Sequence, residues 1–484
     1  MFEDVFRYQY RISRDMPPIH SSWQKKRLDS WTIEHCPALQ SSEIVDGSGK
    51  LVAMVLGIAV SPEGRCIEAQ EALSDTDAQN IEAWIEQLSG RFVVLALVDG
   101  TTRLYCDPSG NLSVVYNAEE QVVASSVTLA IEGDIHPPAD IEIEAIAARQ
   151  QRLLFGETVD RRVTRATPNH YLNLAEFQET RHWPREDTEF ASLDETRNNT
   201  CDEIAERITR NVSALVTRYS CALPITAGRD SRIILAAAHP VLDKVRHFYC
   251  YGLNWATEID AQLGAQLAAH LAVPFQSFLR KSPRVQAAVK KGFVAEEHDR
   301  MRLRTGWCYA MRRDWIDFIE MSPRVDVVLR GTTAEMTRAN KWNGADIGQP
   351  CTAKVGLNKL IKAIRPSDQP TELIERREHQ LLTCYETWMT GLPVAARDRL
   401  YDLAHIEIWI PSVPVLEFSA SVDDFIVNPF NDRRLMHLTS TVAPRARRRS
   451  ALVDGLIRRL CPSLLDFPFH RQFVQSINNA NRPD

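Results

Sequence analysis

One short run of residues has the composition of a loop that grips phosphate. Its members surround one carboxylate and one guanidinium with small or hydroxyl-bearing side chains: Thr226, Ala227, Gly228, Arg229, Asp230 and Ser231. Small residues let the backbone approach an anion closely, and a helix that begins here offers unpaired N–H groups and a partial positive charge. Asp230 is a candidate ligand for a Mg²⁺ that bridges phosphate oxygens. The alternative is an ordinary strand-to-helix turn, because Asp and Ser are also favoured helix caps.

A second run of this kind comes much later in the chain. Gly331, Thr332 and Glu335 follow the apolar stretch 325–329. Glu335 is the second candidate metal ligand, and an ordinary surface carboxylate is the alternative. A basic run then offers positive charge for a triphosphate, with a solvated surface cluster as the alternative: Arg445, Arg447, Arg448 and Arg449. Arg229 and Arg232 are additional candidates for the same role.

Alternating strands and helices are expected to position these residues. Helices are predicted at 202–219, 230–238 and 258–271, and short buried strands at 223–226, 245–250, 273–278 and 325–329. This alternation predicts an α/β domain with a doubly wound parallel sheet. Ligands of such sheets bind beyond the carboxyl ends of the strands, where both runs lie. Beyond about residue 355 the chain is expected to be mostly helical.

The first 185 residues are predicted to form mainly β-strands. Apolar stretches at 51–60 and 92–98 read as strands, and the turn signal Asp99-Gly100 follows the second. Further strands are predicted at 102–106, 112–116 and 122–126, and helices at 75–88 and 141–154. The pattern favours a meander of antiparallel strands. The polar stretch 184–200 lacks apolar periodicity and is the expected linker.

Residues 226–231 resemble the pyrophosphate loop Ser-Gly-Gly-x-Asp-Ser of the asparagine synthetase family. The segments His247–Gly252 and Asn428–Arg433 are similar to the family's second strand and to its Arg-x-Pro-Phe-Leu-Asp segment. The resemblance implies an ATP pyrophosphatase (PP-loop) domain of the adenine nucleotide α-hydrolase type over residues 196–484, with ATP and Mg²⁺ as cofactors. It also implies roles for single residues: nucleotide binding by Tyr251, metal binding by Asp230 and Glu335, and steadying of the leaving pyrophosphate by Arg448 and Arg449.

Residues 1–185 resemble the glutaminase-like, Ntn-hydrolase-type domain of the same enzymes. The resemblance rests on Leu88–Phe92, Asp107–Gly110 and Asn169–Leu172. Active glutaminases of this type expose a Cys nucleophile once the initiator Met is removed. Position 2 is Phe here and no Cys precedes Cys36. Glutamine hydrolysis by that route is therefore not expected.

The resemblance implies an AMP-forming carbon–nitrogen ligase. The carboxylate of a small molecule or peptide would attack the α-phosphate of ATP, and an amine or ammonia would then displace AMP to give an amide. An intramolecular lactam-forming cyclase and an inactive scaffold are the alternatives. The candidate bases for the second step are Tyr309, Tyr401 and Glu417. Three tryptophans are candidate pocket walls, with core packing as the alternative for each: Trp307, Trp342 and Trp409.

Composition narrows the class of protein further. The 484 residues are 44% hydrophobic and 25% charged, enough for two or three cores, and the net charge of −6 disfavours a nucleic-acid binder. The ten cysteines form no CxxC pair, which argues against zinc or iron–sulfur sites and fits a reducing cytosol. The sequence shows neither a signal peptide nor a membrane span, so a cytoplasmic protein is expected. The sequence does not decide the oligomeric state, and a homodimer is one possibility.

Overall fold

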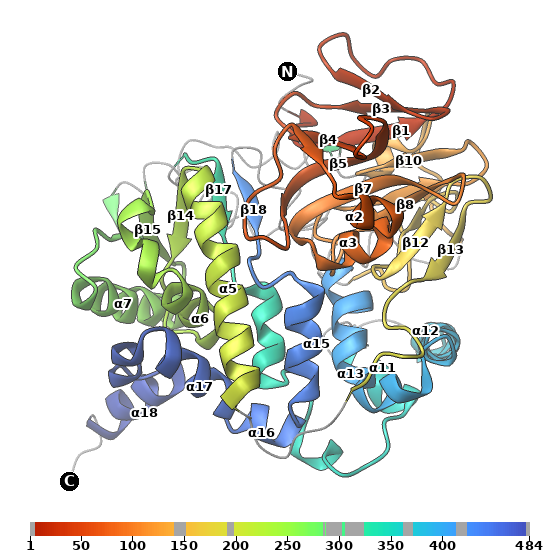
Figure 1. The fold of residues 1–484 in the computed structure, drawn as a ribbon. Helices are drawn as coiled ribbons and strands as arrows, with labels where there is room; N and C mark the ends of the chain where they lie inside the picture. Colours follow the sequence, from red (N-terminus) through yellow and green to blue (C-terminus); the bar gives the residue numbers. More distant parts are fainter. Residues whose placement is uncertain are drawn as a thin grey trace.

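The structure is a computed structural model that describes residues 5–139, 152–190, 198–283, 286, 303–304, 324–361, 371–412 and 424–480. A β-rich first part, red to yellow in Figure 1, lies against an α/β second part, green to blue. Most of the predicted helix at 141–154 falls outside the described residues. In the parts of the chain described here, no helix combines the length and apolar character needed to cross a bilayer.

Two sheets make up the first part. The six-stranded sheet has the order β11-β9-β10-β1-β3-β2, and the seven-stranded sheet has the order β13-β12-β8-β7-β5-β4-β6. The first contains β1 (Tyr10–Ser13), β2 (Gln24–Leu28), β3 (Trp31–His35), β9 (Val115–Asn117), β10 (Val122–Ala124) and β11 (Thr164–Arg165). The second contains β4 (Ser41–Val45), β5 (Leu51–Val60), β6 (Gln70–Ala72), β7 (Ser89–Val98), β8 (Thr101–Cys106), β12 (His170–Asn173) and β13 (Gln178–Arg181). The predicted antiparallel character is confirmed, with the parallel pair of β4 and β6 as an exception.

The central strands of the seven-stranded sheet are buried on both faces. Residues of β5 alternate between two cores: Met54 and Leu56 belong to the main hydrophobic core, whereas Val55 packs in a second core with Trp84 and Ile85. Trp84 and Ile85 lie on α3 (Ile81–Gln87), which follows α2 (Asp75–Gln79). The helix predicted at 75–88 is therefore present, but as two helices. Asn80 separates the two helices because its φ of −124° and ψ of 55° are not helical.

The second part is built on a five-stranded parallel sheet with the order β16-β15-β14-β17-β18. Its strands are β14 (Cys221–Pro224), β15 (His247–Gly252), β16 (Gln276–Leu279), β17 (Val327–Leu329) and β18 (Phe425–Val427). The predicted parallel sheet is therefore confirmed. The mostly helical character expected beyond about residue 355 is confirmed for the described residues, with β18 as an exception, because three apolar residues are too few to carry a strand signal.

Alternating residues of this sheet again face different cores. Cys221 and Leu223 lie in the main core together with Ile208 of α5 and Ile233 of α6, whereas Ala222 belongs to a cluster on the other face. The helices concerned are α5 (Asn198–Arg218) and α6 (Arg229–Ala237), and α7 (Trp255–His270) contributes to the main core as well.

Mostly helical elements complete the second part. The α-helices are α11 (Ala353–Ile361), α12 (Thr371–Thr390), α13 (Leu400–Ala404), α15 (Arg433–Thr441), α16 (Pro444–Arg448), α17 (Ala451–Leu460) and α18 (His470–Ala480). The short helical segments include η3 (Thr332–Arg338), η5 (Val394–Arg399), η6 (His405–Trp409) and η8 (Pro462–Asp466). Segment η6 is a single turn of π-helix.

The order in which strands are added to the sheet changes direction at β14. From β14 it runs outward through β15 and β16, and it then returns to place β17 and β18 on the other side of β14. Adjacent parallel strands whose connections leave in opposite directions have a crevice at their carboxyl ends, the usual ligand position of such sheets. The loops after β14 and β17 leave the sheet at this switch point and contact each other, and they are the two loops that the sequence singled out.

A buried polar seam joins the two parts of the chain. The Asn431 amide donates to the carbonyl of Gly90 and to Asp107 Oδ1, both at 2.7 Å, and accepts from Ser109 Oγ at 2.7 Å. Asn428 donates to Asn111 Oδ1 at 2.6 Å. All of these residues except Asn111 belong to three of the segments on which the family resemblance rests. In this protein these segments therefore form the contact between the two parts of the chain.

Candidate functional site

The turn after β14 is held in shape by its own side chains. Thr226 Oγ1 lies 2.6 Å from Ser231 Oγ and accepts the N–H of Gly228 at 3.0 Å. Gly228 is the N-cap residue of α6, and no side chain caps that helix. The segment is a strand-to-helix turn, as the alternative also expects, but neither Asp230 nor Ser231 caps the helix. An uncapped helix N-terminus keeps its N–H groups available to an anion.

The loop after β17 lies in contact with this turn. A Cβ atom on Gly331 would stand 2.9 Å from the backbone oxygen of Asp230 and 3.3 Å from the nitrogen of Ser231. Thr332 N–H in turn donates to Asn428 Oδ1 at 3.3 Å, which ties the loop to the end of β18. Two runs that are distant in sequence thus form one cradle, defined here as residues 226–231 and 331–338.

An arginine lies between the two predicted metal ligands. Asp230 accepts the Nε and Nη2 hydrogens of Arg338 through its two carboxylate oxygens, at 2.8 and 2.6 Å. Glu335 Oε1 is 3.5 Å from the same Nη2. The other oxygen of Glu335 accepts from Asn340 Nδ2 at 2.7 Å and lies 3.3 Å from His405 Nε2. All four carboxylate oxygens are therefore engaged.

The charges around the cradle shift the pKa values of its members. Burial raises the pKa of Asp230 and outweighs the lowering effect of Arg338, so the net shift is upward. Burial would also raise the pKa of Glu335, but His405 and then Arg338 outweigh it and the net shift is downward. Burial lowers the pKa of Lys341 to about 8. The Lys341 ammonium also lies 3.8 Å from the centre of the Trp409 ring, which stabilises its charged form.

These residues do not fit a divalent cation as they stand. Mg²⁺ requires direct oxygen contacts at about 2.0–2.1 Å in near-octahedral geometry, and the oxygens of Asp230 and Glu335 are already paired with cations and amides. No set of three or more His, Cys, Asp or Glu side chains in the described ranges is arranged to hold a metal ion.

The predicted basic residues have different surroundings. Arg232 is fully buried and donates to the carbonyls of Leu464, Phe467 and Pro468, so it fastens the segment that precedes α18. Arg447 is also fully buried and pairs with Asp402. Neither guanidinium faces solvent. For these two residues, roles in holding the fold replace the predicted contact with phosphate.

Three other arginines remain at or near the surface. Arg448 donates to the carbonyl of Trp342, just beyond η3, and Arg449 is exposed at the end of α16. The guanidinium of Arg229 lies 4.6 Å from the ring of Phe469.

The aromatic candidates lie mainly in packed clusters. The Tyr251 ring meets that of Tyr249 edge to face, at 5.2 Å between ring centres, near the end of β15. Trp342 and Tyr401 meet edge to face at 4.8 Å, and both are buried in the core of the helical part. Core packing, the alternative for Trp342, thus applies. Tyr309, Glu417 and Trp307 lie outside the described residues.

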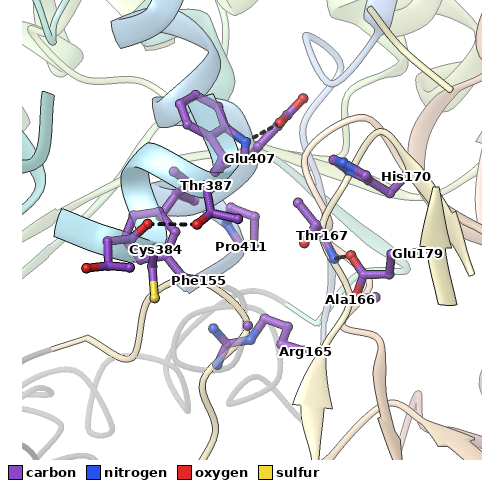
Figure 2. A pocket seen from close by; sticks show the side chains of 14 residues that line it. Phe155, Arg165, Ala166, Thr167, His170, Glu179, Cys384, Thr387, Glu407 and Pro411 are labelled. Carbon is purple, nitrogen blue, oxygen red and sulfur yellow. Dashed lines mark hydrogen bonds between the residues drawn. The ribbon is translucent and has the colours of Figure 1, made fainter. Parts of the chain in front are cut away.

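A cavity of about 430 Å³ lies between the first part and the helices of the second, and Figure 2 shows its lining. Burial lowers the pKa of His170 to about 4, so its imidazole is neutral, with Nδ1 3.1 Å from the carbonyl oxygen of Pro168. Burial raises the pKa of Glu179, which accepts the N–H of Thr167 at 3.1 Å. The cavity therefore offers an imidazole and a carboxyl group in a largely apolar space.

The cavity and the cradle share one helical turn. Glu407 lines the cavity and is held by both Nη atoms of Arg181, at 2.7 and 2.9 Å, and by Trp388 Nε1 at 2.7 Å. His405, two residues earlier in the π-helical turn η6, contacts Glu335 of the cradle. The lining comes from segments far apart in the chain, so no local pattern in the sequence could have revealed this cavity.

Comparison of the sequence with protein-family models gives no match, and a search of curated proteins gives no significant one.

Proposed function

We propose that the protein is an ATP-dependent, AMP-forming carbon–nitrogen ligase of the asparagine synthetase type without glutaminase activity. The proposal includes the finer fold assignments, an Ntn-hydrolase-like first part over residues 1–185 and a PP-loop synthetase domain over 196–484. One observation carries it. The loops after β14 and β17 lie in contact at the point where the order in which strands are added to the parallel sheet changes direction. Nucleotide phosphates commonly bind at such a position, at the N-terminus of a helix.

In the first step, a carboxylate oxygen attacks the α-phosphorus of ATP. The bond from that phosphorus to the β-phosphate oxygen breaks, and pyrophosphate leaves. The uncapped N–H groups of α6 and the Nη1 group of Arg338, which has no acceptor among the described residues, are suited to stabilise the charge on the phosphates. Arg448 and Arg449 remain candidates for contact with the departing pyrophosphate.

In the second step, an amine nitrogen attacks the acyl carbon, loses a proton and displaces AMP. Lys341 is the proposed proton acceptor, because it lies beside Glu335 and burial brings its pKa to about 8. A base whose pKa is near the working pH is the most effective. Lys341→Met is expected to retain pyrophosphate exchange, which reports the first step, and to lose amide formation. Equal loss of both activities would remove Lys341 from this role.

Exchange of labelled pyrophosphate into ATP tests the proposal across a panel of carboxylates. Wild-type protein is expected to exchange with at least one of them. Ser231→Ala removes a hydroxyl of the cradle and should suppress exchange, whereas Ser48→Ala, in an exposed turn of the first part, should leave it unchanged. Absence of exchange with every carboxylate would refute the ligase proposal, and absence of ATP-dependent thermal stabilisation as well would exclude nucleotide binding.

A nucleotide-binding protein without turnover is the second candidate. The ion pair between Asp230 and Arg338 favours it, because this pair engages a carboxylate that the resemblance assigns to a metal. Thermal stabilisation by ATP without pyrophosphate exchange for any carboxylate would select this candidate.

A further inference from the structure

The cradle contains its own cation between two carboxylates. Arg338 makes a two-pronged contact with Asp230, through Nε at 2.8 Å and Nη2 at 2.6 Å, and the same Nη2 is 3.5 Å from Glu335. A guanidinium that contacts both oxygens of a carboxylate in parallel makes one of the strongest ion pairs in proteins. A metal between Asp230 and Glu335 would need the oxygens that Arg338 now holds.

We infer that Arg338 takes the place of a divalent cation in the cradle, so that wild-type protein binds no Mg²⁺ between Asp230 and Glu335. The inference rests on the proposed function only in taking a phosphate as the ligand of the cradle. The single positive charge of Arg338 offsets one of the two carboxylate charges, and its N–H groups occupy both oxygens of Asp230, so the attraction for a metal is weakened. A dication would also be repelled by the fixed charge of the guanidinium.

The local structure explains why Arg338 reaches this position. Arg338 stands three residues after Glu335 in η3, a spacing that puts two side chains on one side of a short helix. Ala339 ends η3 in the left-handed region, with φ of 48°. Contact between Gly331 and the backbone of Asp230 brings the start of η3 against the start of α6. The guanidinium of Arg338 consequently contacts Asp230 in the neighbouring loop.

The remaining partners of Glu335 strengthen the inference. His405 and Asn340 occupy its second oxygen, and Lys341 lies close enough to lower its pKa. The positively charged groups near the two carboxylates thus include Arg338 and Lys341. The free Nη1 side of Arg338 is then available to phosphate oxygens, which a metal would otherwise contact.

Titration with Mn²⁺, followed by electron paramagnetic resonance of the free ion in the absence of nucleotide, tests the inference. Wild-type protein is expected to leave Mn²⁺ free up to millimolar concentration. Arg338→Met uncovers the two carboxylates and should create one site with at least about a tenfold gain in affinity, from which Mg²⁺ displaces Mn²⁺. Adding Asp230→Asn to that variant should abolish the new site.

The controls separate this site from general effects of charge. Arg434→Met removes an arginine that pairs with Glu203 on the surface and should not create a site. Arg338→Lys keeps a cation and should also bind no Mn²⁺. The inference is overturned if folded Arg338→Met gains no site, or if wild-type protein binds one Mn²⁺ that Asp230→Asn removes. The wild-type titration gives this second answer even if the Arg338 variant fails to fold.

The outcome is independent of catalysis. A gained site in Arg338→Met together with no pyrophosphate exchange in wild type would support the inference and refute the ligase proposal. Wild-type exchange together with a wild-type Mn²⁺ site on Asp230 would support the ligase proposal and refute the inference.

Discussion

Replacing Arg447 by Met is expected to destabilise the protein strongly. The guanidinium is fully buried and donates to Asp402 Oδ1 at 3.0 Å and Oδ2 at 2.5 Å. It also donates to the carbonyls of Met336 at 2.8 Å and Val442 at 2.9 Å. The contacts with Asp402 and Met336 tie α16 to α13 and to η3, the segment that carries Arg338 and Glu335. Met fills similar space but leaves the carboxylate of Asp402 buried without a cation.

The expected loss follows from that uncompensated charge. Breaking a buried ion pair on one side costs about 3–5 kcal/mol. Each kcal/mol lowers the melting temperature of a domain of 150–250 residues by about 2–4 °C, so a fall of roughly 6–20 °C is expected. Replacing both partners, with Arg447→Met and Asp402→Leu together, should cost less than Arg447→Met alone, because no buried charge remains.

Urea unfolding and differential scanning calorimetry measure both quantities. Arg445→Met is the matched control: Arg445 lies in the same basic run but is exposed, so its loss should stay within about 0.5 kcal/mol. Equal stability of the Arg447 and Arg445 variants would refute the reasoning. A double variant less stable than Arg447→Met would show that the ion pair is not the source of the loss.

Two further predictions follow from the cradle and from the first part of the chain. Gly331→Ala places a Cβ 2.9 Å from the Asp230 carbonyl oxygen and should lower the free energy of unfolding by about 1–3 kcal/mol, measured by calorimetry. Gly344→Ala is the control, because its Cβ would meet open space. Equal melting temperatures of the two variants would contradict the expected clash. Burial lowers the pKa of His182 to about 4, against the pull of Glu86. The unfolded chain therefore binds a proton between pH 6.5 and 4 that the folded chain does not, and stability should fall by up to about 3 kcal/mol as the pH decreases through this window. His182→Asn should flatten that dependence in urea unfolding, and an unchanged slope would argue against burial as its cause.

The buried seam gives the two parts of the chain a physical reason to stay together. Asp107 accepts N–H groups from Asn111 and Leu112, both at 2.8 Å, which shapes the loop that receives Asn431. Arg433 donates to Asn169 and to the carbonyl of Cys106, at 2.9 and 2.8 Å. The second part would lose partners for several buried polar groups without the first. Unpaired buried polar groups are costly, so the seam ties the two parts together whether or not the first has a catalytic role.

Local pattern was sufficient for several long elements of the fold, but strands such as β1, β3 and β4 were not predicted. The apolar stretch 51–60 is β5 at the predicted bounds, and the amphipathic helix expected at 202–219 is present as α5 with an earlier start, at Asn198. The strand predicted at 223–226 lies two residues earlier, because Ile225 already belongs to the turn. Errors of this kind occur at the ends of elements, where the local sequence favours strand and turn nearly equally.

The sequence by itself determined that two loops rich in small and hydroxyl residues follow strands of a parallel sheet, because strand and helix periodicities are local properties. Only the tertiary structure decided the partners of the carboxylates in those loops. Asp230 and Arg338 are 108 positions apart, and their contact depends on the order of the strands and on a close approach at Gly331. A carboxylate next to a metal and one next to a guanidinium look alike in a sequence. What distinguishes them is which charge the fold places within about 3 Å of their oxygens.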